Sequence, residues 1–333
     1  MPDQPWNVLA LPPLHPDLLA AFLAPLGDRV TLSLPATRDR DGLHAALADA
    51  EIVLGDFTGQ LPLDADAVAV APRLAFVQQV AVGVDGHDLA ALADAGVPLA
   101  NTAGANTISV AEWCLAATFA LLRQVVWSDQ QVRAGNWPQL EMGGRTGELA
   151  ARRVGLVGFG AIGVACATRF AALGCDVSYW TRRRRSPDEE HGATYRDLDD
   201  LVATSDVLVV VVARTPETLG LLSAERMAHL PHGAYVVNAA RGGIVDQAAL
   251  LSLLDAGQLA GAALDVYDTE PPEPDDPIRS NPKVLLSPHA AAVTPQAQLR
   301  LLQATLANVT AAIEGRPVVN VVNGAEPLVR RRV

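Results

Sequence analysis

The sequence predicts an α/β protein with two doubly wound parallel sheets. Short apolar runs alternate with Ala- and Leu-rich helical patterns, and this alternation occurs twice, with a long helical segment between the two series. Alternation of strand and helix is typical of a parallel sheet with helices on both faces. The chain has 333 residues, of which 50% are hydrophobic, so it is long enough for two domains that each bury a core.

The first series spans about residues 5 to 100. Two helices are expected from the patterns DGLHAALADA and GHDLAALADAG, which separate apolar runs. The predicted strands of this series are 8–11, 30–34, 51–55, 74–80 and 97–101.

A long helix is expected next, over residues 108–134. Ser109 and Glu112 have the spacing of a capping box at its start, and Gly135 can end it. The second series of strands begins at residue 154, and a last helix is expected over 295–315. The predicted strands of the second series, a full doubly wound set, are VGLVG, DVSYW, VLVVVV, AYVVNA, GAALDV and VLLSP.

Composition excludes several classes of function. The formal net charge of -12 argues against binding to nucleic acid or to an anionic membrane surface. Cys114, Cys166 and Cys175 suggest no disulfide framework, and no Cys/His spacing resembles a metal site. The N-terminus lacks a basic leader before an apolar core, and the apolar runs are too short for a membrane span. We therefore expect a soluble cytoplasmic protein without a metal.

The stretch VGLVGFGAIG contains a G-x-G-x-x-G motif between an apolar strand and a helix. In this setting each glycine has a physical task. Gly158 permits the tight turn, Gly160 lets a pyrophosphate approach the backbone, and Gly163 lets the helix pack against the strand. The free N–H groups at the helix start bind the anion. The motif predicts a dinucleotide site; the alternative is an ordinary glycine-rich turn.

The residues after the second strand of this series indicate which dinucleotide binds. NAD sites expect an acid there for the ribose 2′-hydroxyl, but Thr181 occupies the position, and Arg182 and Arg183 follow. Guanidinium groups favour a 2′-phosphate, which a carboxylate would repel. NADP(H) is therefore the preferred cofactor, with NAD(H) possible. The alternative is a solvated loop, which is an equally good description of Arg184 and Arg185.

Three polar residues follow three later strands. Arg241, Glu270 and His289 would lie at the carboxyl edge of a parallel sheet, where open α/β sheets bind ligands. An arginine can bind a carboxylate and polarise a carbonyl, a histidine can transfer a proton, and a carboxylate can orient the histidine. Taken singly, each residue has an ordinary structural alternative. Their shared position beside a dinucleotide loop favours a catalytic role.

These motifs resemble the D-isomer-specific 2-hydroxyacid dehydrogenase family, from about residue 74 to residue 324. The resemblance implies two Rossmann-like domains with the active site in a cleft between them. The substrate domain would be discontinuous, 1–101 plus 290–333, and the cofactor domain would span 102–289. The matching motifs are VAVGVDGHD, NTAGANTISVAEW, GNW, the glycine loop, RTPETLGLL, NAARGGIVD, GAALDVYDTEPP and SPHAAA.

The resemblance also implies roles for individual residues. Arg241 would bind the 2-oxo acid, and His289, paired with Glu270, would donate the proton in reduction. The backbone amides of Val82 and Gly83 would hold the substrate carboxylate. The implied cofactor contacts are Ala161 and Ile162 at the pyrophosphate, Asp265 at the nicotinamide carboxamide, Val110 near the nicotinamide, and backbone groups near Ala213 and Ala239 along the cofactor path.

The WTRRRR pattern resembles the NADPH-using glyoxylate and hydroxypyruvate reductases of the family. Reduction of a small 2-oxo acid is therefore the leading hypothesis. The alternatives are an NAD-dependent phosphoglycerate- or phosphite-type dehydrogenase and a dinucleotide-sensing, corepressor-like regulatory protein. Formate dehydrogenases carry Gln in place of the Glu partner, so Glu270 argues against that activity. The resemblance further implies a homodimer formed through the cofactor domain, with the long helix contributing.

Overall fold

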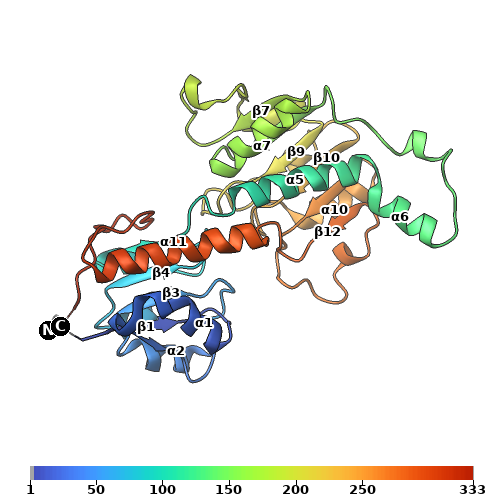
Figure 1. Ribbon diagram of the computed structural model, residues 1–333. Coiled ribbons are helices and arrows are strands. Elements are labelled where there is room, and N and C mark those ends of the chain that lie inside the picture. Colours follow the sequence, from blue (N-terminus) through green and yellow to red (C-terminus); the bar gives the residue numbers. More distant parts are fainter. Residues whose placement is uncertain (1–3, 333) are drawn as a thin grey trace. The chain divides into compact units, whose positions relative to one another are not determined.

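The computed structural model describes residues 4–332 and divides the chain into two compact units (Figure 1). The first unit comprises Met1–Asn106 and Thr294–Val333, and the second comprises Thr107–Val293. The chain crosses between them a few residues after each predicted boundary.

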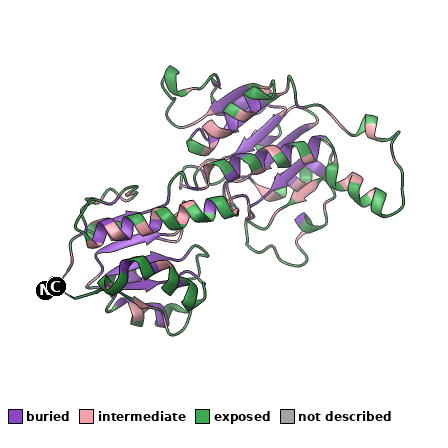
Figure 2. Cartoon of the chain, viewed as in Figure 1, coloured by how far each residue is buried: buried purple, intermediate pink, exposed green. Residues whose placement is uncertain are grey.

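The first unit is built on a parallel five-stranded sheet of order β2-β1-β3-β4-β5. All five predicted strands are present. The order 2-1-3-4-5 is one of the two common doubly wound arrangements. The central strands are buried, whereas the edge strand β2 is partly exposed (Figure 2). Their bounds are β1 Trp6–Ala10, β2 Val30–Ser33, β3 Ile52–Gly55, β4 Phe76–Gln79 and β5 Leu99–Ala100.

The helices of the first unit begin at well-defined caps. The carboxylates of Asp39, Asp64 and Asp88 each accept a hydrogen bond from a backbone N–H in the first turn of the helix that follows. The last helix packs on β4, where Asn308 donates to the side chain of Gln78. The helices are α1 Pro16–Leu23, η1 Ala24–Arg29, α2 Arg40–Leu47, α3 Ala65–Ala69, α4 Leu89–Asp94 and α11 Pro295–Ile313.

The second unit is built on a parallel seven-stranded sheet of order β12-β11-β10-β9-β6-β7-β8. Counted from β6, this is the dinucleotide-binding order 3-2-1-4-5-6 with one further strand, which confirms the predicted fold class. β8 was not predicted, because a strand of two residues is too short to show a hydrophobic pattern. The strands are β6 Arg153–Val157, β7 Asp176–Trp180, β8 Thr194–Tyr195, β9 Val207–Val210, β10 Ala234–Asn238, β11 Leu259–Leu264 and β12 Val284–Leu286.

The predicted helix over 108–134 is wrong as a single element, because it is two helices bent by 57°. Gln124 adopts a left-handed conformation, with φ of 51°, and its side chain donates to the carbonyl oxygen of Leu121. The helices of the second unit are α5 Thr107–Leu122, α6 Val125–Arg133, η2 Met142–Gly144, α7 Ala161–Ala172, η3 Pro187–Glu189, α8 Leu198–Thr204, α9 Ala224–Met227, α10 Gln247–Asp255 and η4 Pro277–Arg279.

The predicted capping box at Ser109 is also wrong. α5 begins two residues earlier, at Thr107, so Ser109 lies within the helix and is buried. Glu112 instead faces Arg169 of α7, at 3.7 Å. The packing of α5 against α7 also buries Cys114 and Cys166.

Within residues 4–332 no single helix has the length and hydropathy to cross a membrane. α5 and α6 meet that criterion only when taken together as a bent pair. The same residues contain no group of three His, Cys, Asp or Glu side chains placed to hold a metal ion.

The first unit contains a buried titratable side chain, His87. Its Nδ1 lies 3.4 Å from the backbone N of Leu63, and its Nε2 lies 3.2 Å from Oε1 of Gln79. Burial lowers the pKa of His87 from 6.5 to about 4, against the opposing charges of Asp56 and Asp85. The imidazole is therefore neutral in the folded protein near pH 7.

We expect His87 to make folding sensitive to acid. Between pH 6.5 and about 4 the unfolded chain binds a proton at His87 that the folded chain does not, so the free energy of unfolding falls as pH falls through this window. His87→Gln should reduce the loss of stability between about pH 7 and about pH 4.5 by roughly 2 kcal/mol. Urea unfolding of both proteins at both pH values measures this; equal losses would contradict it.

Candidate active site

Three neighbouring strands bring the predicted polar residues to one edge of the second sheet. β10, β11 and β12 are parallel and adjacent, and the loops that follow them carry Arg241, Glu270 and His289 respectively. The imidazole Nδ1 of His289 lies 2.6 Å from Oε2 of Glu270. The other oxygen of that carboxylate, Oε1, accepts the backbone N–H of Tyr267 at 3.0 Å.

The Glu270 carboxylate determines which nitrogen of His289 carries the proton. Burial alone would raise the pKa of Glu270, but the hydrogen bonds from His289 and the Tyr267 N–H, together with the charges of His289 and Arg241, hold it below the ordinary value. An ionised carboxylate only accepts hydrogen bonds, so Nδ1 donates. Nε2 is then the atom that can give or take a proton; it has no hydrogen-bond partner among residues 4–332.

The loop that carries His289 is held by the buried carboxylate of Asp265. One oxygen accepts the Ser287 hydroxyl at 2.5 Å and the Ala290 N–H at 2.7 Å, and the other accepts the Ala291 N–H at 2.9 Å. His289 itself has a φ of 51°, a left-handed conformation that costs a non-glycine residue about 1–2 kcal/mol. The hydrogen bonds on either side of His289 stabilise this conformation.

Tyr267 provides a second link between the loops after β11 and β12. Its hydroxyl lies 2.8 Å from the carbonyl oxygen of Ser287 and accepts the N–H of the same residue at 3.1 Å. Burial raises the pKa of Tyr267, and the charges of Asp265 and Glu270 add to the effect, so the hydroxyl remains a donor. No local pattern in the sequence marks Tyr267, because its role depends on a partner twenty residues away.

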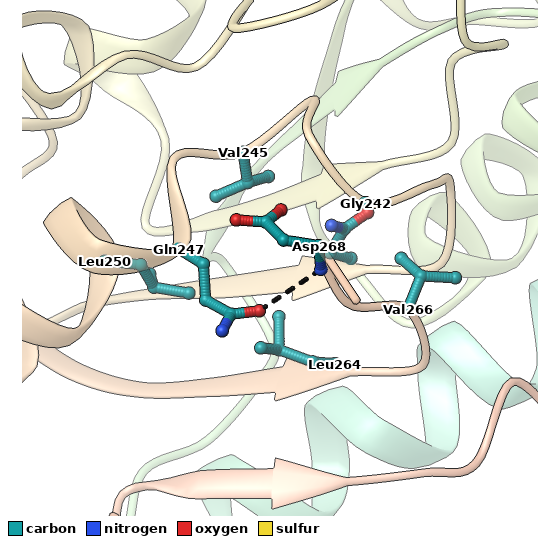
Figure 3. Close-up of a pocket in the computed structure, with 8 residues that line it drawn as sticks. Gly242, Val245, Gln247, Leu250, Leu264, Val266 and Asp268 are labelled. Carbon is teal, nitrogen blue, oxygen red and sulfur yellow. Dashed lines mark hydrogen bonds between the residues drawn. The ribbon is translucent and has the colours of Figure 1, made fainter. Parts of the chain in front are cut away.

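The loop that carries Arg241 packs closely on the loop after β11. A Cβ atom at Gly242 would lie 1.9 Å from the carbonyl oxygen of Tyr267, so only glycine fits. The N–H of Gly243 donates to Asp268 at 2.8 Å. Figure 3 shows a small pocket beside this contact, where the N–H of Asp268 faces the side chain of Gln247. These contacts fix the Arg241 loop relative to Glu270.

The glycine loop between β6 and α7 has the space that a pyrophosphate requires. Gly158 has a φ of 107°, and a Cβ atom there would lie 2.7 Å from the backbone N of Val212. A Cβ atom at Gly163 would lie 2.3 Å from the carbonyl oxygen of Gly158. At Gly160, the residue before α7, a Cβ atom would have no neighbouring atom within 4 Å. The turn and the helix contact are tight, whereas the anion-facing side is open, which fits a dinucleotide.

The four arginines after β7 differ in their contacts. Arg184 pairs with Glu190 at 2.9 Å, and Arg185 donates to the carbonyl oxygen of Phe159 at 3.3 Å. Arg182 faces Glu217 at 3.5 Å, while Arg183 has no hydrogen bond or ion pair with any residue of the described chain. Arg182 and Arg183, which directly follow Thr181, are thus the ones with weak or no internal contacts.

The other predicted contact residues lie on several elements. Val110 is buried in α5, and Ala239 follows β10 directly. Ala161 and Ile162 form the first turn of α7. The carbonyl oxygen of Ala213 accepts the hydroxyl of Thr218 at 2.8 Å. Val82 and Gly83 belong to the first unit, in the loop that follows β4.

Comparison with known proteins identifies the family. Residues 115–291 match the family described as "D-isomer specific 2-hydroxyacid dehydrogenase, NAD binding domain". Over 265 residues the chain is 38% identical to D-3-phosphoglycerate dehydrogenase of Archaeoglobus fulgidus, covering 79% of this chain and 50% of that relative. This chain therefore spans about half the length of that relative.

Two further matches extend over most of both chains. Glyoxylate reductase of Aeropyrum pernix is 35% identical over 296 residues, which cover 87% of this chain and 85% of that protein. The holo form of D-mandelate dehydrogenase from Rhodotorula graminis has a TM-score of 0.89 at 25% identity, and the match covers 98% of this chain and 99% of that one. As its motifs predicted, the chain belongs to the D-isomer-specific 2-hydroxyacid dehydrogenase family.

Proposed function

We propose that the protein catalyses the reduction of a small 2-oxo acid, glyoxylate or hydroxypyruvate first, to a D-2-hydroxy acid, and the reverse oxidation. The observation that carries the proposal is the Glu270–His289 pair at the strand edge that also presents Arg241. The similarity to a protein named glyoxylate reductase supports this substrate class.

Each side chain has a distinct task in the proposed reaction. The guanidinium of Arg241 binds the 2-oxo acid and polarises its carbonyl. Nε2 of His289 holds the proton that passes to the carbonyl oxygen in reduction and takes it back in oxidation. Glu270 keeps the imidazole oriented and stabilises its charged form. The N–H groups of Val82 and Gly83 bind the substrate carboxylate. A nicotinamide dinucleotide, when bound, supplies the hydride to the carbonyl carbon.

NADP(H) is the cofactor that we propose, with NAD(H) as a weaker alternative. The pyrophosphate would bind at Gly158–Gly163 and the first turn of α7, and the 2′-phosphate would bind Thr181, Arg182 and Arg183. The support is the absence of an acid at residue 181 and the weak internal contacts of Arg182 and Arg183. Asp265, with a lone pair left on its buried carboxylate, would accept the carboxamide N–H.

A second candidate is NAD-dependent oxidation of a phosphorylated hydroxy acid. The similarity to D-3-phosphoglycerate dehydrogenase favours it, although that relative is about twice as long as the matched segment. The relative rates with glyoxylate, hydroxypyruvate and 3-phosphoglycerate, each measured with both cofactors, distinguish the two candidates.

We also propose a cytoplasmic homodimer formed through the second unit. α6 and the segment after it expose large apolar side chains, a pattern typical of interfaces. They are Val125, Val126, Val132, Trp137 and Leu140, the last 97% exposed.

His289→Ala should reduce kcat about a hundredfold to ten-thousandfold, because the proton donor is lost. The Kd for NADPH, measured by fluorescence, should stay close to that of the wild type. His229→Ala is the matched control and should retain full turnover, because this exposed histidine precedes β10 whereas Arg241 follows that strand. Normal kcat in His289→Ala would refute its role.

The double variant Arg182→Ala/Arg183→Ala should lose the preference for NADPH over NADH by about tenfold or more in kcat/KM, because a desolvated 2′-phosphate would lose charge-assisted hydrogen bonds. Arg184→Ala, whose guanidinium already pairs with Glu190, is the control and should change the preference little. If the wild type shows no preference for NADPH, Arg182 and Arg183 are solvated loop residues without a role in cofactor choice.

Gly242→Ala should lower kcat/KM for the 2-oxo acid at least about tenfold, because the new methyl group would push apart the loops that hold Arg241 and Glu270. The clash is with backbone, which cannot rotate away. Gly144→Ala, where an added Cβ meets open space, should behave like the wild type. Equal kinetics in the two variants would show that the loop contact has no part in activity.

A further inference from the structure

The two backbone carbonyls of the Val82–Gly83 segment are each held by a side chain of the first unit. Asn101 donates its amide to the carbonyl oxygen of Val82 at 2.7 Å, and Gln79 donates to that of Gly83 at 3.2 Å. The N–H groups of Val82 and Gly83 make no hydrogen bond within residues 4–332. A segment whose carbonyls are held and whose N–H groups are unpaired is prepared to bind an anion.

Gln79 is the last residue of β4 and is 4% exposed. Its Nε2 donates to the carbonyl oxygens of both Asp56 and Gly83, at 3.3 and 3.2 Å. One buried amide therefore links the loop after β3 to the loop after β4. Gly55 makes room for it, because a Cβ atom there would lie 2.1 Å from the Gln79 Oε1.

His87 fixes the orientation of the Gln79 amide. Nδ1 of His87 accepts the N–H of Leu63, so the proton of the neutral ring lies on Nε2 and is donated to Oε1 of Gln79. With Oε1 used as an acceptor, the NH2 group must face the two carbonyls. Because the pKa of His87 is low, the ring is neutral near pH 7. Nδ1 therefore stays an acceptor and Nε2 stays a donor.

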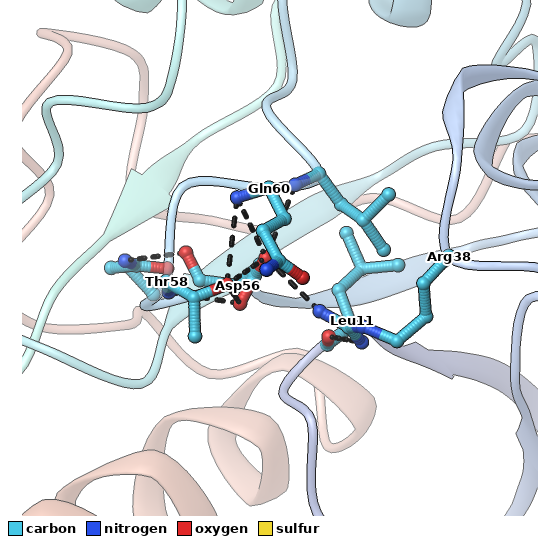
Figure 4. A network of polar contacts seen from close by, with 7 residues as sticks. Leu11, Arg38, Asp56, Thr58 and Gln60 are labelled. Carbon is cyan, nitrogen blue, oxygen red and sulfur yellow. Dashed lines mark hydrogen bonds and ion pairs between the residues drawn. The ribbon is translucent and has the colours of Figure 1, made fainter. Parts of the chain in front are cut away.

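The loop on the other side of Gln79 is rigid for a separate reason. Figure 4 shows the carboxylate of Asp56, which is fully buried and accepts the N–H groups of Thr58 and Gln60 together with the guanidinium of Arg38. The carbonyl oxygen that Gln79 contacts belongs to this same Asp56. Gln79 thus connects the Val82–Gly83 segment to the rigid loop that contains Asp56.

We propose that Gln79, oriented by His87, is a positioning residue that aims the Val82 and Gly83 amides at the substrate carboxylate. The proposal rests on the proposed function, because it assumes that these amides bind a 2-oxo acid. Gln79 does not touch the substrate. Its loss should therefore weaken substrate binding and leave the reacting groups of the second unit unchanged.

The test compares Gln79→Met and Gln79→Glu with Gln78→Met in the full chain. Gln79→Met removes both hydrogen bonds to the carbonyls at nearly constant volume, and Gln79→Glu keeps an acceptor for His87 but has no donor. Gln78 is a buried neighbour on the same strand. Its side chain accepts from Asn308 and donates to the backbone carbonyl of Gln79, but it makes no hydrogen bond to Asp56, Val82 or Gly83, so Gln78→Met is the matched control. Thermal unfolding of all three variants reports any general loss of stability.

We expect KM for glyoxylate to rise about tenfold in both Gln79 variants, the effect of losing one or two hydrogen bonds. We expect kcat and the Kd for NADPH to stay within about twofold to threefold of the wild type, and KM to stay normal in Gln78→Met. A purely structural role would instead affect the Gln78 and Gln79 variants alike. Normal KM in both Gln79 variants would overturn the proposal while the proposed function stands.

A second readout separates this proposal from the proposed function. In protein labelled with 15N-valine and 15N-glycine, oxamate, an unreactive analogue of a 2-oxo acid, should shift the amide signals of Val82 and Gly83 in the wild type and much less in Gln79→Met. If the wild type reduces no 2-oxo acid but shows this difference, the positioning role stands and the proposed function fails. If oxamate shifts both proteins equally, the positioning role is refuted.

Discussion

The carboxylate of Asp265 is the interaction on which the candidate active site depends. It is 2% exposed and accepts three hydrogen bonds from the loop that carries His289. Without it the N–H groups of Ala290 and Ala291 would lose their partner, at a cost of about 1–3 kcal/mol for each group left buried and unpaired. A carboxylate has about four acceptor positions, so three internal bonds still leave one for a ligand. Holding the loop and meeting a cofactor are therefore compatible tasks for one side chain.

The parallel sheet explains why so much of this site could be predicted. Apolar strands buried on both faces give clear patterns, and every parallel strand ends at the same edge, so Arg241, Glu270 and His289 had to come near one another once the strand order was known. Contacts between loops carry no such pattern. The hydrogen bond from the Gly243 N–H to Asp268 depends on how two loops fold against each other. Neighbouring residues in the sequence do not determine that arrangement.

In the first unit, too, the strands could be predicted and the side-chain contacts could not. The run LAFVQQV predicted β4 correctly, but the sequence could not distinguish Gln78 from Gln79, because adjacent strand residues face opposite sides of the sheet. The two side chains have partners on different elements: Asn308 of the last helix for Gln78, and His87 and the carbonyl of Asp56 for Gln79. The break at Gln124 is of the same kind, because nothing in its helix-compatible neighbours requires a left-handed residue there.

The four consecutive arginines after β7 have the same side chain but different contacts in the folded protein. Arg185 bonds to the carbonyl of Phe159, which lies between two glycines of the loop after β6, so the run and the glycine loop are joined before any ligand binds. A dinucleotide that uses both would meet a preorganised surface, which reduces the entropic cost of binding. If NADP(H) is the cofactor, as we propose, Arg182 exchanges Glu217 for the 2′-phosphate. The exposed pair at 3.5 Å that it gives up is worth at most about 1 kcal/mol, so this pair would oppose phosphate binding only weakly.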